Sequence, residues 1–313
     1  MMPEEVFIKK SFWRYFRMEE RKKHEIHWVN REDANFPERL KKLTGMPKKL
    51  YYIGNLPDPA KPSAAVVGAR MSSPYGRCQA FKYARTMAEH GVQIISGMAR
   101  GIDSEGHKGA LDTDTPTFAV LGSGVDVCYP ESNRRLYERI LEKGGGIISE
   151  LPPGTKPQNW TFPARNRIIS ALSDAVLVVE AKEQSGSLIT ANFALEHGHS
   201  VYAVPGAVTD ELSRGCNKLI FDGAGIAYTP EIMLMEWGIQ VENPPANIQK
   251  KKLGLAPDLD LVYSGLDLRP ENMDHIIRKT GFSAAKVCTI LTELQLMGLV
   301  QETGRKYCRV PEN

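Results

Sequence analysis

The chain has 313 residues, of which 42% are hydrophobic and 25% are charged, and its formal net charge at pH 7 is only +3. This length predicts about two domains, and the five scattered cysteines, which include no Cys-x-x-Cys pair, argue against disulfides and a zinc site and for a reducing compartment. No apolar run approaches the length of a membrane span, and the first 17 residues mix charges and aromatic rings too freely for a secretory signal, so we expect a cytoplasmic protein with no membrane or metal partner.

The positive charge is concentrated at the N-terminus. Residues 1–49 contain 13 Lys or Arg against 8 Asp or Glu, a surplus of five, which leaves the remainder of the chain at −2. A basic segment attracts phosphate in a manner that fades with salt, although a solvated packing segment explains the same composition equally well. We expect residues 1–49 to be a basic lead-in to the first domain.

A short apolar strand at residues 65–67 runs into Gly68, and the helical pattern of residues 75–90 follows. The Ser72-Ser73-Pro74 sequence between them is typical of a helix start. A glycine turn between a strand and a helix exposes backbone N–H groups at the positive end of the helix dipole, and Arg70 adds a full charge there, so we predict a phosphate site. The chain lacks both the three-glycine dinucleotide fingerprint and a Gly-Lys-Ser/Thr loop, and we therefore expect no NAD, ATP or other cofactor.

Further apolar strands alternate with helical patterns along the chain. They are expected at residues 92–96, 117–121, 146–149, 175–180, 200–204 and 225–228. Such alternation predicts an α/β fold in which a mostly parallel, doubly wound sheet is covered by helices on both faces.

Small residues follow three of these strands, in the turns Ser96–Gly101, Leu121–Gly124 and Glu183–Ser187. Each glycine cluster alone is explained equally well by a tight turn without a ligand. In parallel sheets, however, ligands bind beyond the carboxyl ends of the strands, so the recurrence of such turns favours one crevice that they line together with Arg70.

Two arginines and an asparagine, in the sequence Arg165-Asn166-Arg167, precede a run at residues 174–181 that is typical of a buried strand. Arginine holds phosphate through a planar fork of N–H donors, and Phe162 or the nearby Trp160 offers a flat surface on which a base could stack. Taken alone, arginines at a helix start are more often solvated or paired at the surface. Because a second arginine-bearing turn occurs at Arg70, we favour a polynucleotide ligand over surface pairing of these arginines.

The pattern changes after residue 238. The polar, proline-bearing stretch 239–253 is predicted to be a linker between a sheet domain at 50–238 and a small domain at 254–313. In that small domain, helices are expected at 258–264, 269–279 and 283–297, and a hairpin at 299–302 and 306–310, which is the outline of a winged helix. Its expected recognition helix carries one basic residue, Lys286, and the domain has 7 basic against 8 acidic residues, so a protein-contact module is favoured over duplex binding.

Motifs spread over residues 28–237 carry a family resemblance. In chain order they are Gly68-Ala69-Arg70, Ser96-Gly97 through Gly101-Ile102-Asp103 with His107, Gly122 to Asp126 with Tyr129-Pro130 and Asn133, Ser149-Glu150, Phe162-Pro163 with Arg165-Asn166-Arg167, Glu180 with Ser185-Gly186-Ser187 and Thr190-Ala191, and Pro205-Gly206. Together they resemble the DNA-processing protein A family, also called DprA or Smf. The resemblance implies an extended Rossmann-like domain that binds single-stranded DNA, forms a homodimer, protects incoming DNA and loads the RecA recombinase in natural transformation, without catalysis.

The resemblance also implies a basic DNA pocket with Arg70 and the arginines of the Arg165-Asn166-Arg167 motif. With the turns, the expected DNA- or phosphate-binding set is Gly68, Arg70, Gly97, Gly122, Asn133, Phe162, Arg165, Asn166, Arg167, Gly186 and Ser187, and no catalytic residue is expected. The chain departs from the family at Glu131, where family members often have lysine after the Tyr-Pro pair, and this departure lowers the expected basicity of the pocket.

The competing interpretation is a Rossmann-like enzyme that splits nucleoside monophosphates, a phosphoribohydrolase. Such enzymes need a carboxylate in the crevice, and Asp103, Glu105 and His107 offer an acid–base group on one helix turn. The favoured explanation is simpler, with Asp103 as a helix N-cap and His107 as an ordinary helix-face residue.

Overall fold

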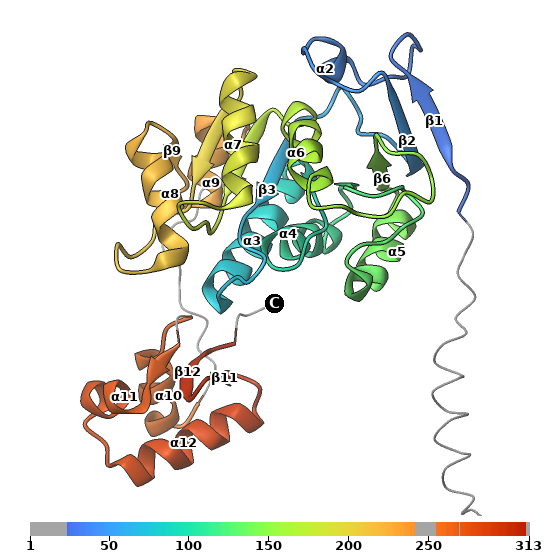
Figure 1. Cartoon of the computed structure of the whole chain (residues 1–313). Helices are drawn as coiled ribbons and strands as arrows, with labels where there is room; N and C mark the ends of the chain where they lie inside the picture. Colours follow the sequence, from blue (N-terminus) through green and yellow to red (C-terminus); the bar gives the residue numbers. More distant parts are fainter. Residues whose placement is uncertain (1–23, 242–254, 269, 311–313) are drawn as a thin grey trace, which may run out of the picture.

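The structure is a computed structural model that describes residues 24–241, 255–268 and 270–310 (Figure 1). Within these residues the chain forms a nine-stranded sheet in the order β1-β2-β6-β5-β4-β3-β7-β8-β9 and a three-stranded sheet in the order β10-β12-β11. The strands of the large sheet are β1 His27–Asn30, β2 Lys49–Gly54, β3 Ser63–Val67, β4 Gln93–Ser96, β5 Thr117–Val120, β6 Gly146–Ser149, β7 Ala175–Val178, β8 Ser200–Ala203 and β9 Gly225–Ile226.

The seven strands from β6 to β9 in this order pair in parallel, and β2 and β1 add an antiparallel edge. This arrangement confirms the predicted mostly parallel α/β sheet. Strand β1 lies inside the segment 1–49 that was expected as a lead-in, and its pairing with β2 makes this part of the segment an edge of the sheet.

Helices cover both faces of the sheet, as predicted. Helices α2 Glu38–Lys41, α6 Thr161–Ala171, α7 Gly186–Glu196 and α8 Glu211–Phe221 pack on one face around a core that includes Leu50, Ile169 and Val176. Helices α3 Pro74–Glu89, α4 Ile102–Leu111, α5 Arg134–Glu142 and α9 Pro230–Glu236 cover the other face, and a single-turn 3-10 helix, η1 Glu131–Asn133, precedes α5. The central strands are buried on both sides, and for this reason they appear in the sequence as continuous apolar runs.

The small three-stranded sheet belongs to a separate hydrophobic core that includes Val262, Ile276 and Leu294. Its elements are α10 Pro257–Gly265, β10 Glu271–Asn272, α11 Met273–Thr280, α12 Ala284–Leu296, β11 Val300–Thr303 and β12 Lys306–Arg309. The expected helix from residue 269 is wrong at its start, because Glu271 and Asn272 pair with β12 and the helix begins only at Met273. Arg269 itself lies outside the described residues. In the described ranges, none of the helices combines the length and hydrophobicity that a bilayer crossing needs.

Candidate nucleic-acid interface

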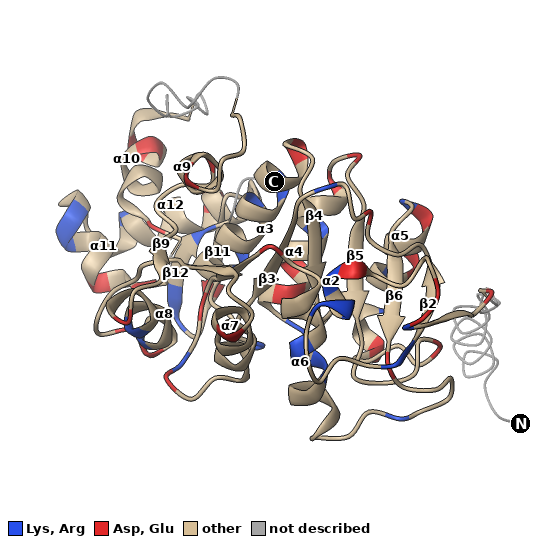
Figure 2. Cartoon of the chain, turned by 90° about the horizontal axis from the view of Figure 1, so that it is seen from above, with Lys and Arg blue, Asp and Glu red and all other residues tan. Residues whose placement is uncertain are grey.

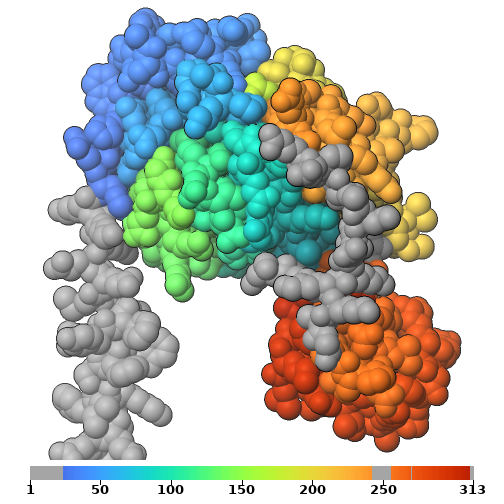
Figure 3. Space-filling view, turned by 180° about the vertical axis from the view of Figure 1, so that it is seen from behind, coloured from blue at the N-terminus to red at the C-terminus, as the bar shows by residue number. Residues whose placement is uncertain are grey.

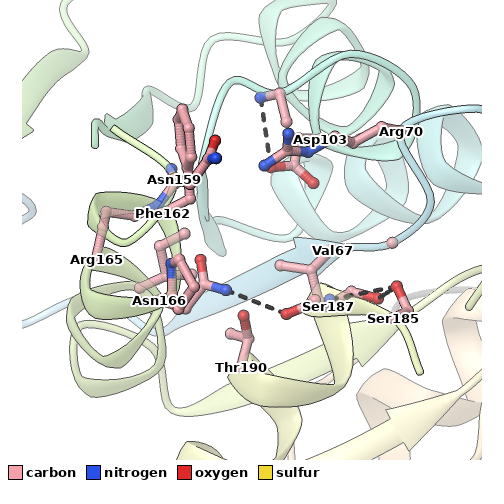
Figure 4. A pocket seen from close by; sticks show the side chains of 15 residues that line it. Val67, Arg70, Asp103, Asn159, Phe162, Arg165, Asn166, Ser185, Ser187 and Thr190 are labelled. Atoms are coloured by element: carbon pink, nitrogen blue, oxygen red, sulfur yellow. Dashed lines mark hydrogen bonds between the residues drawn. The ribbon is translucent and has the colours of Figure 1, made fainter. Parts of the chain in front are cut away.

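The sheet has a topological switch point between β3 and β7. The chain leaves β3 towards β4 on one side and leaves β7 towards β8 on the other, although β3 and β7 are paired neighbours. A cavity of about 370 Å³ lies at their carboxyl ends (Figure 4). Its lining includes Gly68 and Arg70 after β3, Ala99 and Asp103 after β4, Asn159, Phe162, Arg165 and Asn166 at α6, and Ser185, Gly186, Ser187 and Thr190 at α7. This is the place where open α/β sheets bind ligands.

Arg70 is the exposed cation of the cavity. Its guanidinium carbon lies 4.9 Å from the centre of the Phe162 ring, and the Phe162 ring lies 5.5 Å from that of Tyr129. Among the described residues, no carboxylate comes within ion-pair distance of Arg70. An exposed guanidinium without an ion-pair partner can bind a phosphate through its N–H groups. The ring of the half-buried Phe162 holds this guanidinium in place.

Arg165 is the buried cation of the cavity, with only 4% of its surface exposed. One of its terminal nitrogens donates to the carbonyl of Val120, while its Nε is buried and has no hydrogen-bond partner in the described chain. Burial lowers the pKa of Arg165 to about 10, so the side chain stays charged at neutral pH. A buried charge with an unsatisfied donor at the edge of a cavity is well suited to an anionic ligand.

The backbone of Gly97 leaves room for Arg165. A Cβ at this position would lie 2.1 Å from the Nη1 atom of Arg165, which is closer than packed atoms can approach. Gly122 has a similar relation to the Phe162 ring, because a Cβ there would lie 2.9 Å from its Cδ1 atom. Both expected glycines therefore contact the side chains that line the cavity, and neither lines it directly.

Asp103 is the acid of the cavity and is 7% exposed. Its carboxylate accepts hydrogen bonds from the backbone N–H groups of Gly97 and Ala99, at 3.2 and 3.4 Å. Burial raises the pKa of Asp103, and the opposing effects are the charge of Arg165, these two hydrogen bonds and the charge of Arg70. The N-cap of α4 is Gly101 and has no side-chain cap, so the expectation that Asp103 caps this helix is wrong. Asp103 instead accepts hydrogen bonds from backbone N–H groups of the turn that precedes the helix.

His107 and Glu105 do not converge with Asp103. His107 lies on the buried face of α4, and its Nδ1 lies 2.7 Å from the hydroxyl of Thr117. Burial, aided by the charge of Arg165, lowers the pKa of His107 to about 3. Glu105 pairs with Lys108 at 2.8 Å. In the described residues, no group of three or more His, Cys, Asp or Glu side chains is placed to hold a metal ion.

The start of α3 does not offer the predicted anion site. Ser73 caps this helix by accepting from the backbone N–H of Gly76, as the sequence indicates. The carboxylate of Glu180 already occupies this helix end, because it accepts from the Ser73 backbone N–H at 2.9 Å and from the Ser73 hydroxyl. The predicted binding of a phosphate at this helix start is therefore wrong, although Arg70 on the same turn does line the cavity.

The helix start that faces the cavity belongs to α7. Ser185 caps it by accepting from the backbone N–H of Ser187, and the two hydroxyls lie 2.8 Å apart. Asn166 donates to the carbonyl of Gly186 at 3.2 Å and so connects α6 to this turn (Figure 4). The backbone N–H groups and the positive dipole end of α7 thus lie in the same cavity as Arg165.

Several expected residues lie outside the cavity. Arg167 pairs with Glu150 at 2.6 Å, and Asn133 donates to the Met98 carbonyl and the Ser104 hydroxyl at 2.8 and 2.9 Å. Glu131, the departure from the family pattern, lies 3.5 Å from Arg134 and is also absent from the lining. No pattern in the sequence points to Asn159, whereas Thr190 follows the Ser185–Ser187 turn by one helical turn. Figure 2 shows Lys and Arg positions in blue on α6.

A mostly parallel α/β sheet with an arginine-lined cavity at its switch point defines a Rossmann-like protein with a candidate anion site. Residues 27–238 match the model of the DNA recombination-mediator protein A family, and residues 244–304 match the DprA winged helix domain. The chain belongs to the DNA recombination-mediator protein A family, which confirms the resemblance found in the sequence motifs.

Known relatives cover most of the chain. Protein Smf of Escherichia coli K12 is 37% identical over 91% of this chain and 77% of its own length. The X-ray structure of DNA processing protein A from Streptococcus pneumoniae has a TM-score of 0.64 at 37% identity and covers 77% of this chain and 84% of that one. A structure of DNA processing protein A from Helicobacter pylori, which describes a single-stranded DNA binding mode of that protein, has a TM-score of 0.62 at 28% identity and covers 68% of this chain and 96% of that one.

Proposed function

We propose that this chain is a non-enzymatic single-stranded DNA-binding protein that protects incoming DNA and loads RecA recombinase onto it in natural transformation and recombination. The observation that carries the proposal is the cavity at the switch point, where the exposed Arg70 and the buried Arg165 meet the open start of α7. The relative from Helicobacter pylori, described as binding single-stranded DNA, supports the choice of ligand.

A phosphate fits this cavity chemically. Arg70 supplies an exposed guanidinium, Arg165 supplies one buried donor without a partner, and the α7 turn supplies backbone N–H groups. Each charge-assisted contact of this kind contributes about 1.5 to 3 kcal/mol. A phosphate here would also offset the desolvation of Arg165, which is otherwise opposed only by Asp103.

The aromatic side chains beside the cavity can stack on an unpaired base. Phe162 and Tyr129 form a ring pair at the rim, and Trp160, directly before α6, is 66% exposed. Bases in a duplex are stacked on each other and cannot lie on protein rings, whereas a single strand can. Of the amide side chains in the lining, Asn166 already donates to the Gly186 carbonyl, and we expect recognition through phosphates and stacking with little dependence on base sequence.

The separation of Asp103, Glu105 and His107 supports a role without catalysis. Of these three, only Asp103 lines the cavity, and the backbone N–H groups of Gly97 and Ala99 donate to its carboxylate. His107 faces Thr117 inside the protein and is neutral at physiological pH. Incubation with nucleoside monophosphates should release no free base, and release that stops in Asp103→Asn would instead favour the phosphoribohydrolase.

A homodimer is the second part of the proposal. Strand β9 is an edge of the sheet, and large apolar side chains near it are exposed: Phe221 by 89%, Tyr228 by 71% and Ile226 by 49%. Exposed apolar side chains gathered at a sheet edge are typical of a protein contact. Light scattering on the full chain and on Phe221→Ser tests this face.

The winged-helix domain is proposed as a protein-contact module. The linker expected at 239–253 is wrong at its start, because Ile239 and Val241 pack against the core of the sheet domain, and its residues 242–253 lie outside the described residues. The exposed cation of α12, Lys286, pairs with Asp258 at 2.7 Å and lies 3.9 Å from the Phe282 ring. A cation that is already paired within the domain releases few counterions on binding a duplex. This domain therefore adds little to the attraction for DNA.

Titration with a labelled oligothymidine, and with a duplex of equal length, tests the function. At two salt concentrations we expect tighter binding of the single strand at both and a fall in affinity with salt. Equal affinity for the duplex would contradict the proposal.

A further inference from the structure

A second aromatic and cationic surface lies away from the cavity, on the antiparallel edge of the large sheet. We call it the Trp28 platform; it consists of Trp28, Lys49 and Tyr51. Trp28 and Tyr51 are direct cross-strand partners in β1 and β2, and the Nζ atom of Lys49 lies 4.1 Å from the Trp28 ring centre and 4.9 Å from that of Tyr51. The function proposed above does not use any of these side chains.

Strand geometry explains why this surface is open. Side chains alternate along a strand, so Val29 and Leu50 point into the core and are 1% and 0% exposed, while their neighbours in the platform point to the opposite face. Farther along that opposite face, α5 covers β2 at Ile53, which is 4% exposed. Figures 1 and 3 show the N-terminal strands next to α5 at one end of the molecule. At the other end of the strand pair the indole of Trp28 remains 55% exposed.

The register places the platform at the same edge of the sheet as the cavity. Tyr51 lies opposite Ser149, the last residue of β6, so the platform is level with the carboxyl end of β6. Five inter-strand steps separate β3 from β1, the strand that carries Trp28, a span of about 24 Å at roughly 4.8 Å a step. Between them, in the segment after β5, Tyr129 is 45% exposed and contacts Phe162 of the cavity.

The platform has the chemistry of a nucleotide contact. A large exposed aromatic ring stacks on any base, and a lysine beside it attracts the phosphate of the same nucleotide. Within the described part of the chain, Lys49 has no carboxylate at ion-pair distance. The lysine–indole contact also stabilises the strand pair, but that role alone does not need the ring to stay exposed.

We propose that the Trp28 platform is a second contact for the same DNA strand, which runs from the cavity along the carboxyl edge of the sheet and stacks a base on Trp28. This inference rests on the proposed function. At an axial rise of ~3.4 Å per stacked nucleotide, the span of about 24 Å corresponds to roughly seven nucleotides. An oligomer shorter than this span reaches the cavity alone, and a longer one reaches both contacts.

The test compares oligothymidines of about 4 and about 16 nucleotides with the full chain and its variants. Trp28→Ala should weaken binding of the longer oligomer by about 5- to 150-fold, the effect of a lost stacked base, and change binding of the shorter one by less than about twofold. Trp28→Phe keeps a ring and should retain most of the affinity. Lys49→Gln should lower the salt dependence for the longer oligomer, whereas Lys82→Gln, an exposed lysine on α3, should not.

Tryptophan fluorescence reports the contact directly, even where Trp28→Ala lowers the melting temperature. The emission of Trp28 is obtained as the difference between the emission of the unchanged protein and that of Trp28→Phe. The longer oligomer should quench this emission, and the shorter one should not. Equal losses for both lengths, or no loss and no quenching, would overturn the platform. Arg70→Ala should weaken both lengths, and an unchanged protein that binds neither length would refute the proposed function and the platform together.

Discussion

Replacement of Arg70 by alanine is the sharpest test of the cavity. Arg70 is exposed, contacts the Phe162 ring and has no ion-pair partner in the described chain, so its loss should cost about 1 kcal/mol of folding stability or less. The lost charge-assisted contact to phosphate should cost about 1.5 to 3 kcal/mol of binding, which is about a 10- to 150-fold loss of affinity. The slope of log K against log salt should also fall by about 0.7, the value for one phosphate on a single strand.

Fluorescence anisotropy with a labelled oligothymidine at several salt concentrations measures both quantities. Arg214→Ala is a matched control, because Arg214 is an exposed arginine on α8 outside the cavity and should leave affinity within about twofold. We also expect Arg70→Ala to weaken binding more than any single Lys→Ala change among residues 1–49. Equal effects of Arg70→Ala, Arg214→Ala and those lysine changes would refute the reasoning, since binding would then follow total charge.

Three further predictions address the rim, the small domain and the buried histidine. Phe162→Leu should lose about 1 to 3 kcal/mol of binding with little change in melting temperature, whereas lower melting with unchanged affinity per folded molecule would make Phe162 a packing residue. Deletion of residues 254–313 should leave most single-strand affinity in gel shifts, and a loss above about tenfold would show DNA contact by the winged helix. Burial lowers the pKa of His107 to about 3. Below about pH 6.5 the unfolded state therefore binds a proton that the folded state does not bind. The free energy of unfolding should fall as the pH decreases from 6.5 towards 3. Between pH 7 and pH 5 this amounts to about 2 kcal/mol, which denaturant titration should detect and His107→Gln should remove; an unchanged pH dependence in the variant would contradict the assignment.

The sheet was predictable from the sequence because its signals are local. Runs such as residues 175–179 are continuously apolar, as expected for strands buried on both faces, and the small-residue turns that follow them mark the carboxyl edge. The winged helix was predictable for the same reason, through helix starts such as Ser283, which caps α12. The shift at the start of α11 depends on pairing with β12, which no local pattern reveals.

The site was predictable only in part, because it depends on contacts between distant residues. Glu180 lies 107 residues after Ser73 in the sequence, and its carboxylate occupies the start of α3, where the sequence predicted a site for a phosphate. Arg165 and Arg167 are two residues apart on α6, so they face different sides of the helix, one towards the cavity and the other towards Glu150. The motif identified both arginines, but only the packing of α6 distinguishes them.

The carboxylate of Glu180 has a consequence for how a strand would lie on the protein. Two helices, α3 and α7, begin beyond the paired strands β3 and β7, and each start could in principle attract an anion. Because Glu180 neutralises one of them, the switch point keeps a single helix start for phosphate. In the proposed complex, the register of the strand is thus determined by an acidic side chain that the DNA does not touch.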